Sequence, residues 1–168
     1  MRRAGALTVA VLLAASPAAA QDPVANGTVF GDWTVVCAAE AVGRTVCALA
    51  QTLVDPADGG LLAEIGLNPI GSGPEAQLVM VLRTPAAMLL PVRPAFRVGE
   101  GPTVALTWHT CAGESCTALL TLGAEDIAAL RRGLTMIVGY QPLAKDRPLS
   151  FPVSLRGITA GLAALGVP

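Results

Sequence analysis

The chain has 168 residues, of which 53% are hydrophobic and 14% charged, and its formal net charge at pH 7 is −1. No run of lysine and arginine forms a basic stripe, so the sequence argues against nucleic acid or anionic lipid as a partner. A chain of this length is typical of one domain and buries roughly two thirds of its unfolded surface, so it does not need disulfides to form a core.

Residues 1–20 show the three parts of a secretory signal peptide. The basic start, the apolar run and the small residues before a cleavage site lie at Arg2 and Arg3, at 4–15, and at Ala18 and Ala20. The apolar run is too short for a membrane span, which needs about 20 residues. We therefore predict cleavage between Ala20 and Gln21, followed by a single domain over 21–168 with no integral membrane segment.

Export would place the mature chain in the periplasm, with the outer surface or secretion as the other destinations. It would also remove Arg2 and Arg3 and leave nine basic side chains against twelve acidic ones. These compartments are oxidising, which affects how the cysteines are interpreted.

The chain contains four cysteines, at Cys37, Cys47, Cys111 and Cys116. An even number in an exported chain predicts disulfides, and three pairings are possible. Pairing of Cys37 with Cys47 and of Cys111 with Cys116 is favoured, because each pair flanks a turn. Zinc binding and thiol exchange stay open as alternatives, although the chain has no C-x-x-C motif and only one histidine, His109.

Local pairing also predicts the register of two hairpins, because side chains alternate along a strand with a period of two. The first hairpin would have the pairs Cys37–Cys47, Val35–Leu49 and Trp33–Gln51, and the second Cys111–Cys116, His109–Ala118 and Thr107–Leu120. Trp33 and Trp108 are interpreted as buried or half-buried sheet residues, since aromatic side chains carry a large apolar area.

Eight strand-like runs are separated by segments rich in glycine and proline, which predicts a β-sandwich or a barrel. The runs are 30–37, 45–54, 61–68, 76–83, 103–111, 116–122, 134–141 and 149–155. The segment 88–98 contains Pro91 and Pro94, and proline cannot donate to a ladder. We expect this segment to form an interrupted edge element.

Two helices are also predicted. The segment 124–132 has acidic residues in its first turn and arginines in its last, and Gly133 follows as a glycine C-cap. An apolar stripe at helical spacing runs through the C-terminal segment at Leu155, Ile158, Leu162 and Leu165. The stripe is expected to dock on the sheet, because the segment lacks the aromatic residues and positive charges of a membrane-surface helix.

Four segments, taken in order, resemble the invasion-associated locus B family of exported bacterial proteins. They are "GDWTVVC", "VCALAQ", "CAGESCTALLTL" and "PLSFPVSLRGITAGLAAL". The resemblance covers essentially the whole mature chain, from about Thr28 to Leu165. It matches the four cysteines to the family's cysteines, Trp33 to its aromatic residue and Gly157 to its tail glycine.

The resemblance implies a mainly-β chain with an immunoglobulin-like antiparallel β-sandwich, which the two predicted helices would accompany. The family is named for a role in host-cell invasion and has no established catalytic residues. It therefore implies a non-catalytic protein-interaction or envelope-associated module, with no cofactor or metal. The partner would be an unknown protein of the envelope or of a host.

The alternative is a hydrolase or a thiol-active periplasmic enzyme. A catalytic triad would require His109 to meet a carboxylate and one of four serines, Ser72, Ser115, Ser150 or Ser154. The spacing does not indicate this, and the chain has no G-x-S-x-G motif, phosphate-binding glycine loop or paired histidine ligands. His109 is interpreted as a strand residue near a hairpin tip.

Overall fold

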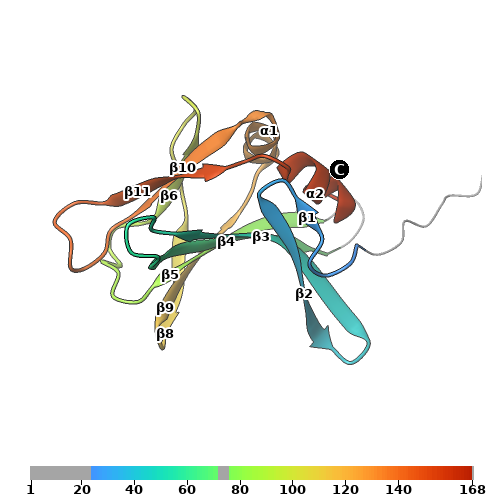
Figure 1. Cartoon of the computed structure of the whole chain (residues 1–168), viewed down its shortest axis with the longest axis horizontal. Coiled ribbons are helices and arrows are strands. Elements are labelled where there is room, and N and C mark those ends of the chain that lie inside the picture. Colours follow the sequence, from blue (N-terminus) through green and yellow to red (C-terminus); the bar gives the residue numbers. More distant parts are fainter. Residues whose placement is uncertain (1–23, 72–75, 168) are drawn as a thin grey trace, which may run out of the picture.

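The computed structural model describes residues 24–71 and 76–167 (Figure 1). The predicted signal peptide, with its cleavage site between Ala20 and Gln21, lies outside the described residues. Within them, no helix has the length and apolar character that crossing a membrane requires.

The described chain contains eleven strands and two helices. The strands are β1 (Val29–Phe30), β2 (Trp33–Ala41), β3 (Arg44–Val54), β4 (Leu61–Ile70), β5 (Gln77–Pro85), β6 (Ala95–Val98), β7 (Val104–Ala105), β8 (Thr107–Ala112), β9 (Ser115–Thr121), β10 (Thr135–Tyr140) and β11 (Leu149–Ser154). The helices are α1 (Ala124–Arg132) and α2 (Ile158–Ala164).

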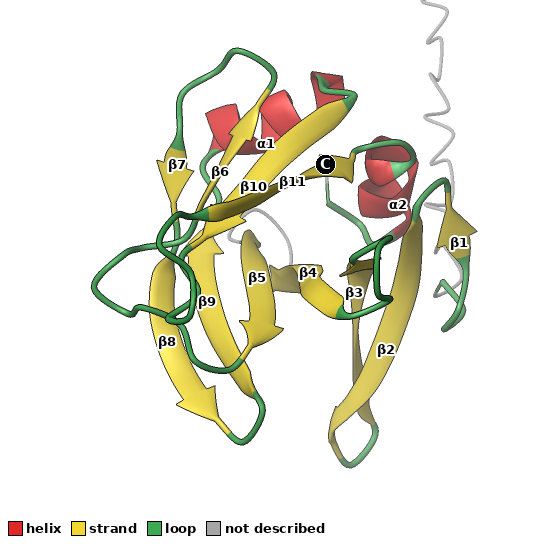
Figure 2. Ribbon diagram, turned by 60° about the vertical axis from the view of Figure 1, so that its left-hand side comes forward, coloured by secondary structure: helices red, strands yellow, loops and turns green. Residues whose placement is uncertain are grey.

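The strands form two antiparallel sheets, which confirms the predicted mainly-β sandwich. The larger sheet has the order β1-β2-β3-β4-β5-β9-β8 and the smaller one β11-β10-β6-β7. Figure 2 shows the smaller sheet above the larger one, with the helices at the same level as the smaller sheet. Immunoglobulin constant domains order their strands A-B-E-D and C-F-G, so the likeness lies in the packing of two antiparallel sheets.

Alternation along the strands explains which residues form the core. One face of β4 and β5 is buried, at Ala63, Ile65, Leu67, Leu78, Met80 and Leu82. These residues belong to a single apolar cluster with Phe96, Met136 and Val153 of the smaller sheet. The core therefore lies between the two sheets, and Trp33, with 0% exposure, belongs to it as predicted.

The first hairpin has the predicted register, but its ladder begins at the pair Thr34–Ala50 and does not include the predicted pair Trp33–Gln51. Cys37 is paired with Cys47 and Val35 with Leu49 across β2 and β3. Val35 and Leu49 are both buried, so this register places the apolar side chains toward the core.

The second hairpin has the predicted register only at its tip, where Cys111 is paired with Cys116. A bulge between Trp108 and Thr110 leaves His109 without a partner in the ladder. The observed pairs are Trp108–Ala118 and Thr107–Leu119, so the predicted pairs His109–Ala118 and Thr107–Leu120 were wrong. The physical reason is that a bulge inserts one extra residue into one strand and shifts everything beyond it.

The predicted edge element at 88–98 is also corrected. The strand in this segment, β6, begins at Ala95 directly after Pro94, and it lies between β10 and β7 in the interior of the smaller sheet. Pro91 and Pro94 both precede the residues of β6 that pair. They therefore affect where the strand begins but do not prevent it from lying in the interior of the smaller sheet.

Helix α1 has the predicted bounds, but Gly133 does not end it in a left-handed conformation. Its φ is −73°, which any residue can adopt. A Cβ atom at Gly133 would lie 2.4 Å from Cγ1 of Val98 and 2.8 Å from Cδ1 of Leu155. Glycine is therefore required at position 133 by close packing, and not by a left-handed C-cap conformation.

Helix α2 docks on the inner face of the larger sheet, as its apolar stripe predicted. Ile158 and Leu162 are buried. A Cβ atom at Gly161 would lie 2.3 Å from Cδ1 of Leu49, so the helix backbone touches the side chains of β3 directly.

Candidate functional site

The two disulfides each close one hairpin. Cys37 of β2 is bonded to Cys47 of β3, and their Cα atoms lie 4.0 Å apart. Cys111 of β8 is bonded to Cys116 of β9, also with 4.0 Å between Cα atoms. The bonds join directly opposed residues of neighbouring strands, so they hold the hairpin registers described above.

The residues considered for catalysis are not brought together. His109 is exposed on β8, and no hydrogen bond joins it to a serine or a carboxylate among residues 24–71 and 76–167. Ser115 is paired with Ala112 at the tip of the second hairpin, and Ser154 is hydrogen bonded to Asp32. Ser150 is exposed on β11, and Ser72 lies outside the described residues. In the described part of the chain, no group of three or more potential ligands is placed to hold a metal ion.

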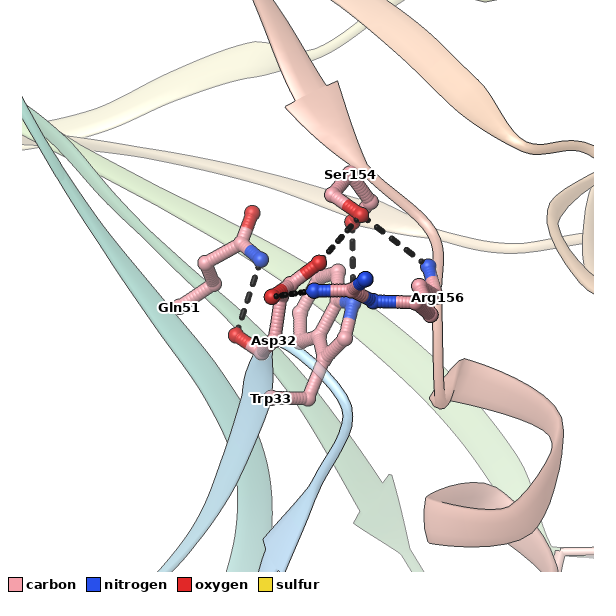
Figure 3. Close-up of polar contacts among 5 residues, drawn as sticks. All are labelled: Asp32, Trp33, Gln51, Ser154 and Arg156. Atoms are coloured by element: carbon pink, nitrogen blue, oxygen red, sulfur yellow. Dashed lines mark hydrogen bonds and ion pairs between the residues drawn. The ribbon is translucent and has the colours of Figure 1, made fainter.

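The main polar cluster joins the turn before β2 to the chain after β11 (Figure 3). Oγ of Ser154 donates to Oδ2 of Asp32 at 2.6 Å, and Nη2 of Arg156 donates to Oδ1 at 2.7 Å. The backbone N–H of Asp32 donates to the carbonyl oxygen of Arg156 at 3.1 Å. Nε1 of Trp33 donates to the carbonyl oxygen of Ser154 at 3.0 Å. We call Asp32, Trp33, Ser154 and Arg156 the clasp.

Two glycines allow the backbones of the clasp to touch. A Cβ atom at Gly31 would lie 2.3 Å from the carbonyl oxygen of Arg156, and one at Gly157 would lie 2.0 Å from that of Phe30. Gly31 has φ +59° and Gly157 has φ +93°, in the region that side chains disfavour. Both positions therefore exclude larger residues by contact and by conformation.

The clasp shifts the titration of its charged groups. Hydrogen bonds from Arg156 and then from Ser154 hold the pKa of the Asp32 carboxyl below its usual value. The hydrogen bond to Asp32, followed by its charge, raises the pKa of Arg156. The Arg156 side chain is 76% exposed and that of Asp32 33%, so solvent screens the ion pair. The ion pair therefore matters more for orienting the two segments than for stability.

This geometry does not make a hydrolytic site. Ser154 directs its proton to Asp32 and accepts a hydrogen bond from the backbone N–H of Arg156 at 3.2 Å. A carboxylate with a lowered pKa is a weak base near neutral pH, and no histidine is placed to activate the serine. The clasp instead joins two distant segments of the chain through hydrogen bonds and an ion pair.

A separate feature is an exposed apolar patch on the loops 86–94 and 141–148. Its side chains are between 37% and 65% exposed and belong to Leu89, Leu90, Val92 and Leu143, which we call the loop patch.

The backbone under the loop patch is well anchored. The N–H of Leu89 donates to the carbonyl oxygen of Gln141 at 2.9 Å, and that of Leu143 donates to Ala87 at 2.8 Å. Nε1 of the half-buried Trp108 donates to the carbonyl oxygen of Val92 at 3.0 Å. Ala87 has φ +64°, a conformation unfavourable for alanine, so the surrounding contacts hold strained backbone in place.

Sequence reasoning singled out Trp33 and Gly157 but not the contact between their segments, and it missed Asp32 and Arg156. A signal was present, because "GD" at 31–32 and "RG" at 156–157 each place a glycine beside a charge, with opposite signs. The loop patch was also missed, since exposed leucines look like core residues in a sequence.

Two packed antiparallel sheets, two stapled hairpins and a clasp between distant segments define a disulfide-stapled β-sandwich protein. The family model described as Invasion associated locus B (IalB) protein matches residues 33–166. The chain belongs to this family, as the resemblance in its sequence indicated.

Relatives and a solved structure agree with this assignment. An invasion protein B homolog of Brucella abortus strain 2308 is 27% identical over 160 residues, which cover 94% of this chain and 90% of the homolog. The homolog from B. abortus biovar 1 strain 9-941 gives the same values. The crystal structure of invasion associated protein b from Bartonella henselae matches with a TM-score of 0.69 at 20% identity, over 82% of this chain and 92% of that chain. This last match shows that the two chains share a fold.

Proposed function

We propose that this protein is an exported, non-catalytic interaction protein of the bacterial envelope, acting in the periplasm or at the cell surface. The observation that carries the proposal is the loop patch. Exposed apolar side chains that gather on neighbouring loops mark contacts with other proteins. Strained backbone persists only where surrounding structure enforces it, and such strain is concentrated at functional sites.

Three further observations support the proposal. Residues 1–20 have the pattern of a signal peptide, and two disulfides suit an oxidising compartment. The relatives from Brucella are named as homologs of invasion protein B, which favours a contact with an envelope or host protein. His109, the only histidine, is exposed and lies apart from Ser154 and Asp32, which are engaged in the clasp.

The proposal is tested by placing a photo-crosslinking amino acid at Leu90 of the mature, oxidised protein and exposing it to envelope fractions of the source bacterium. The matched control carries the same group at Val29, which is 62% exposed but lies on β1, outside the loop patch. A specific adduct is expected from position 90 and not from position 29. Leu143→Gln should reduce that adduct about tenfold, as loss of one apolar contact residue predicts.

Equal labelling from positions 90 and 29 would contradict the role of the loop patch. A hydrolytic activity of the purified protein that disappears in His109→Ala would contradict its non-catalytic character.

A further inference from the structure

Two hollows lie beside α1, and the second reaches residues of the clasp. The first, mainly apolar, has a volume of about 1010 Å³ and lies between α1 and the loop that joins β6 to β7. The second, more polar, has a volume of about 660 Å³ and is lined by Asp32, Ser154 and Arg156 of the clasp. Gly133 and Leu134 line both, so the two hollows adjoin at these residues, and we call them the apolar part and the polar part of the α1 groove. Volumes of this size are typical of sites for small molecules.

The two parts differ in chemistry. The apolar part is lined by side chains of both the smaller sheet and α1, among them Phe96, Val98, Val104 and Ala128. The polar part is lined by two guanidinium groups, two hydroxyl groups and one carboxylate, from Arg131, Arg156, Ser154, Thr159 and Asp32. The groove is therefore amphipathic along its length.

The two ends of the α1 groove differ in charge. The polar part is lined by two arginines and one carboxylate; Arg156 is paired with Asp32, and Arg131 has no ion pair among the described residues. Nη2 of Arg131 donates to the carbonyl oxygen of Val167, while its buried Nε has no hydrogen-bond partner among the described residues.

The opposite end of the groove is acidic. Glu125 and Asp126, in the first turn of α1, line the apolar part together with Arg132 from the last turn. Asp126 is engaged in capping, since it accepts a hydrogen bond from the N–H of Gly123 at 3.0 Å. A negative group is therefore favoured at the arginine end and disfavoured near Glu125.

Leu134 lies where the two parts meet, and it is 85% exposed. Its backbone is held in place, because its carbonyl oxygen accepts a hydrogen bond from the N–H of Leu155 at 3.0 Å. A leucine fixed at the mouth of a groove gains apolar contact when a hydrocarbon chain covers it.

We infer that the α1 groove binds a fatty acid, with its carboxylate at Arg131 and Arg156 and its hydrocarbon chain passing Leu134 toward Phe96. The fork of a guanidinium group suits a carboxylate. The sequence argued against anionic lipid because it has no basic stripe, but the fold brings together two arginines that lie 25 positions apart. This inference goes beyond the proposed function, since the loop patch shares no residue with the groove.

The test measures binding of dodecanoate, below its micelle concentration, to the mature oxidised protein by calorimetry. One site is expected. Leu134→Gln should weaken binding about tenfold through lost apolar contact, whereas Leu143→Gln, at a position 65% exposed on another surface, should not. Arg131→Gln should weaken binding by a similar factor, and Arg147→Gln, on an exposed loop, should leave it unchanged.

Dodecyltrimethylammonium, with the same chain length and a positive head group, is expected to bind at least about tenfold more weakly than dodecanoate to the unmodified protein. Because this comparison uses the unmodified protein, it tests the inference even if a groove variant has a lowered melting temperature. Absence of dodecanoate binding, equal binding of the cation, or equal effects of Leu134→Gln and Leu143→Gln would overturn the inference. Because Leu143→Gln should impair only the crosslink at the loop patch, failure of one proposal is distinguishable from failure of the other.

Discussion

Among the glycines of the described residues, Gly157 leaves the least room for a Cβ atom. Its φ of +93° disfavours any side chain, and a Cβ atom would lie 2.0 Å from the carbonyl oxygen of Phe30. Because that oxygen belongs to the backbone, it cannot move aside at small cost. Gly157→Ala is therefore expected to lower the free energy of unfolding by about 3 kcal/mol or more, measured by urea denaturation.

Gly43 provides the matched control for this substitution. It also has a positive φ, +73°, but nothing lies within 4 Å of a Cβ atom built there. Gly43→Ala should therefore cost only the left-handed conformation, about 1–2 kcal/mol. Equal losses at the two positions would show that the contact with Phe30 is unimportant.

Among the elements, the β2–β3 and β8–β9 hairpins extend away from the rest of the chain (Figure 1). Each is closed by one disulfide, between residues 10 and 5 positions apart. In the chain-entropy model, these loops contribute about 2.8 and about 2.2 kcal/mol to the free energy of unfolding. Replacing both cysteines of one pair by serine should lower that free energy by about these amounts in urea denaturation.

Each paired variant should keep its two sheets, because only one of the four cysteines, Cys116, belongs to the core between them. A far-ultraviolet circular dichroism spectrum provides the check. A chain that is unfolded at 25 °C after loss of one disulfide would show that the hairpins and the core are not separable in this way.

For the molecule as a whole, the clasp joins Asp32 to Arg156 across 124 positions of the sequence. The pKa of Asp32 is lowered in the folded chain. Its contribution to stability is therefore present above its unfolded pKa of about 3.9 and is lost as the pH falls through the folded value.

Asp32→Asn is expected to remove this contribution and to flatten the decline of stability below about pH 4. Melting temperatures measured from pH 6 to pH 2.5 provide the comparison, with Asp146→Asn, on an exposed loop, as the control. Parallel profiles for the parent and Asp32→Asn would contradict the coupling of the clasp to folding.

Local patterns in the sequence were sufficient for most elements. Strict alternation and glycine-rich turns located the principal strands, charge placement located α1, and the spacing of Cys37 and Cys47 predicted the register of the first hairpin. Each of these signals acts over about ten residues, because side-chain periodicity and turn chemistry depend on near neighbours in the chain.

The features that sequence reasoning missed depend on contacts between distant segments. Tertiary packing places Asp32 against Arg156, inserts the bulge at His109, puts β6 in the interior of its sheet and presses Gly133 against Val98. It also brings α1 beside the β6–β7 loop to form the α1 groove. The propensity of a segment to form a strand or helix does not depend on which distant segment packs against it. The long-range contacts are instead selected when burial of apolar surface and close packing favour one arrangement of the two sheets.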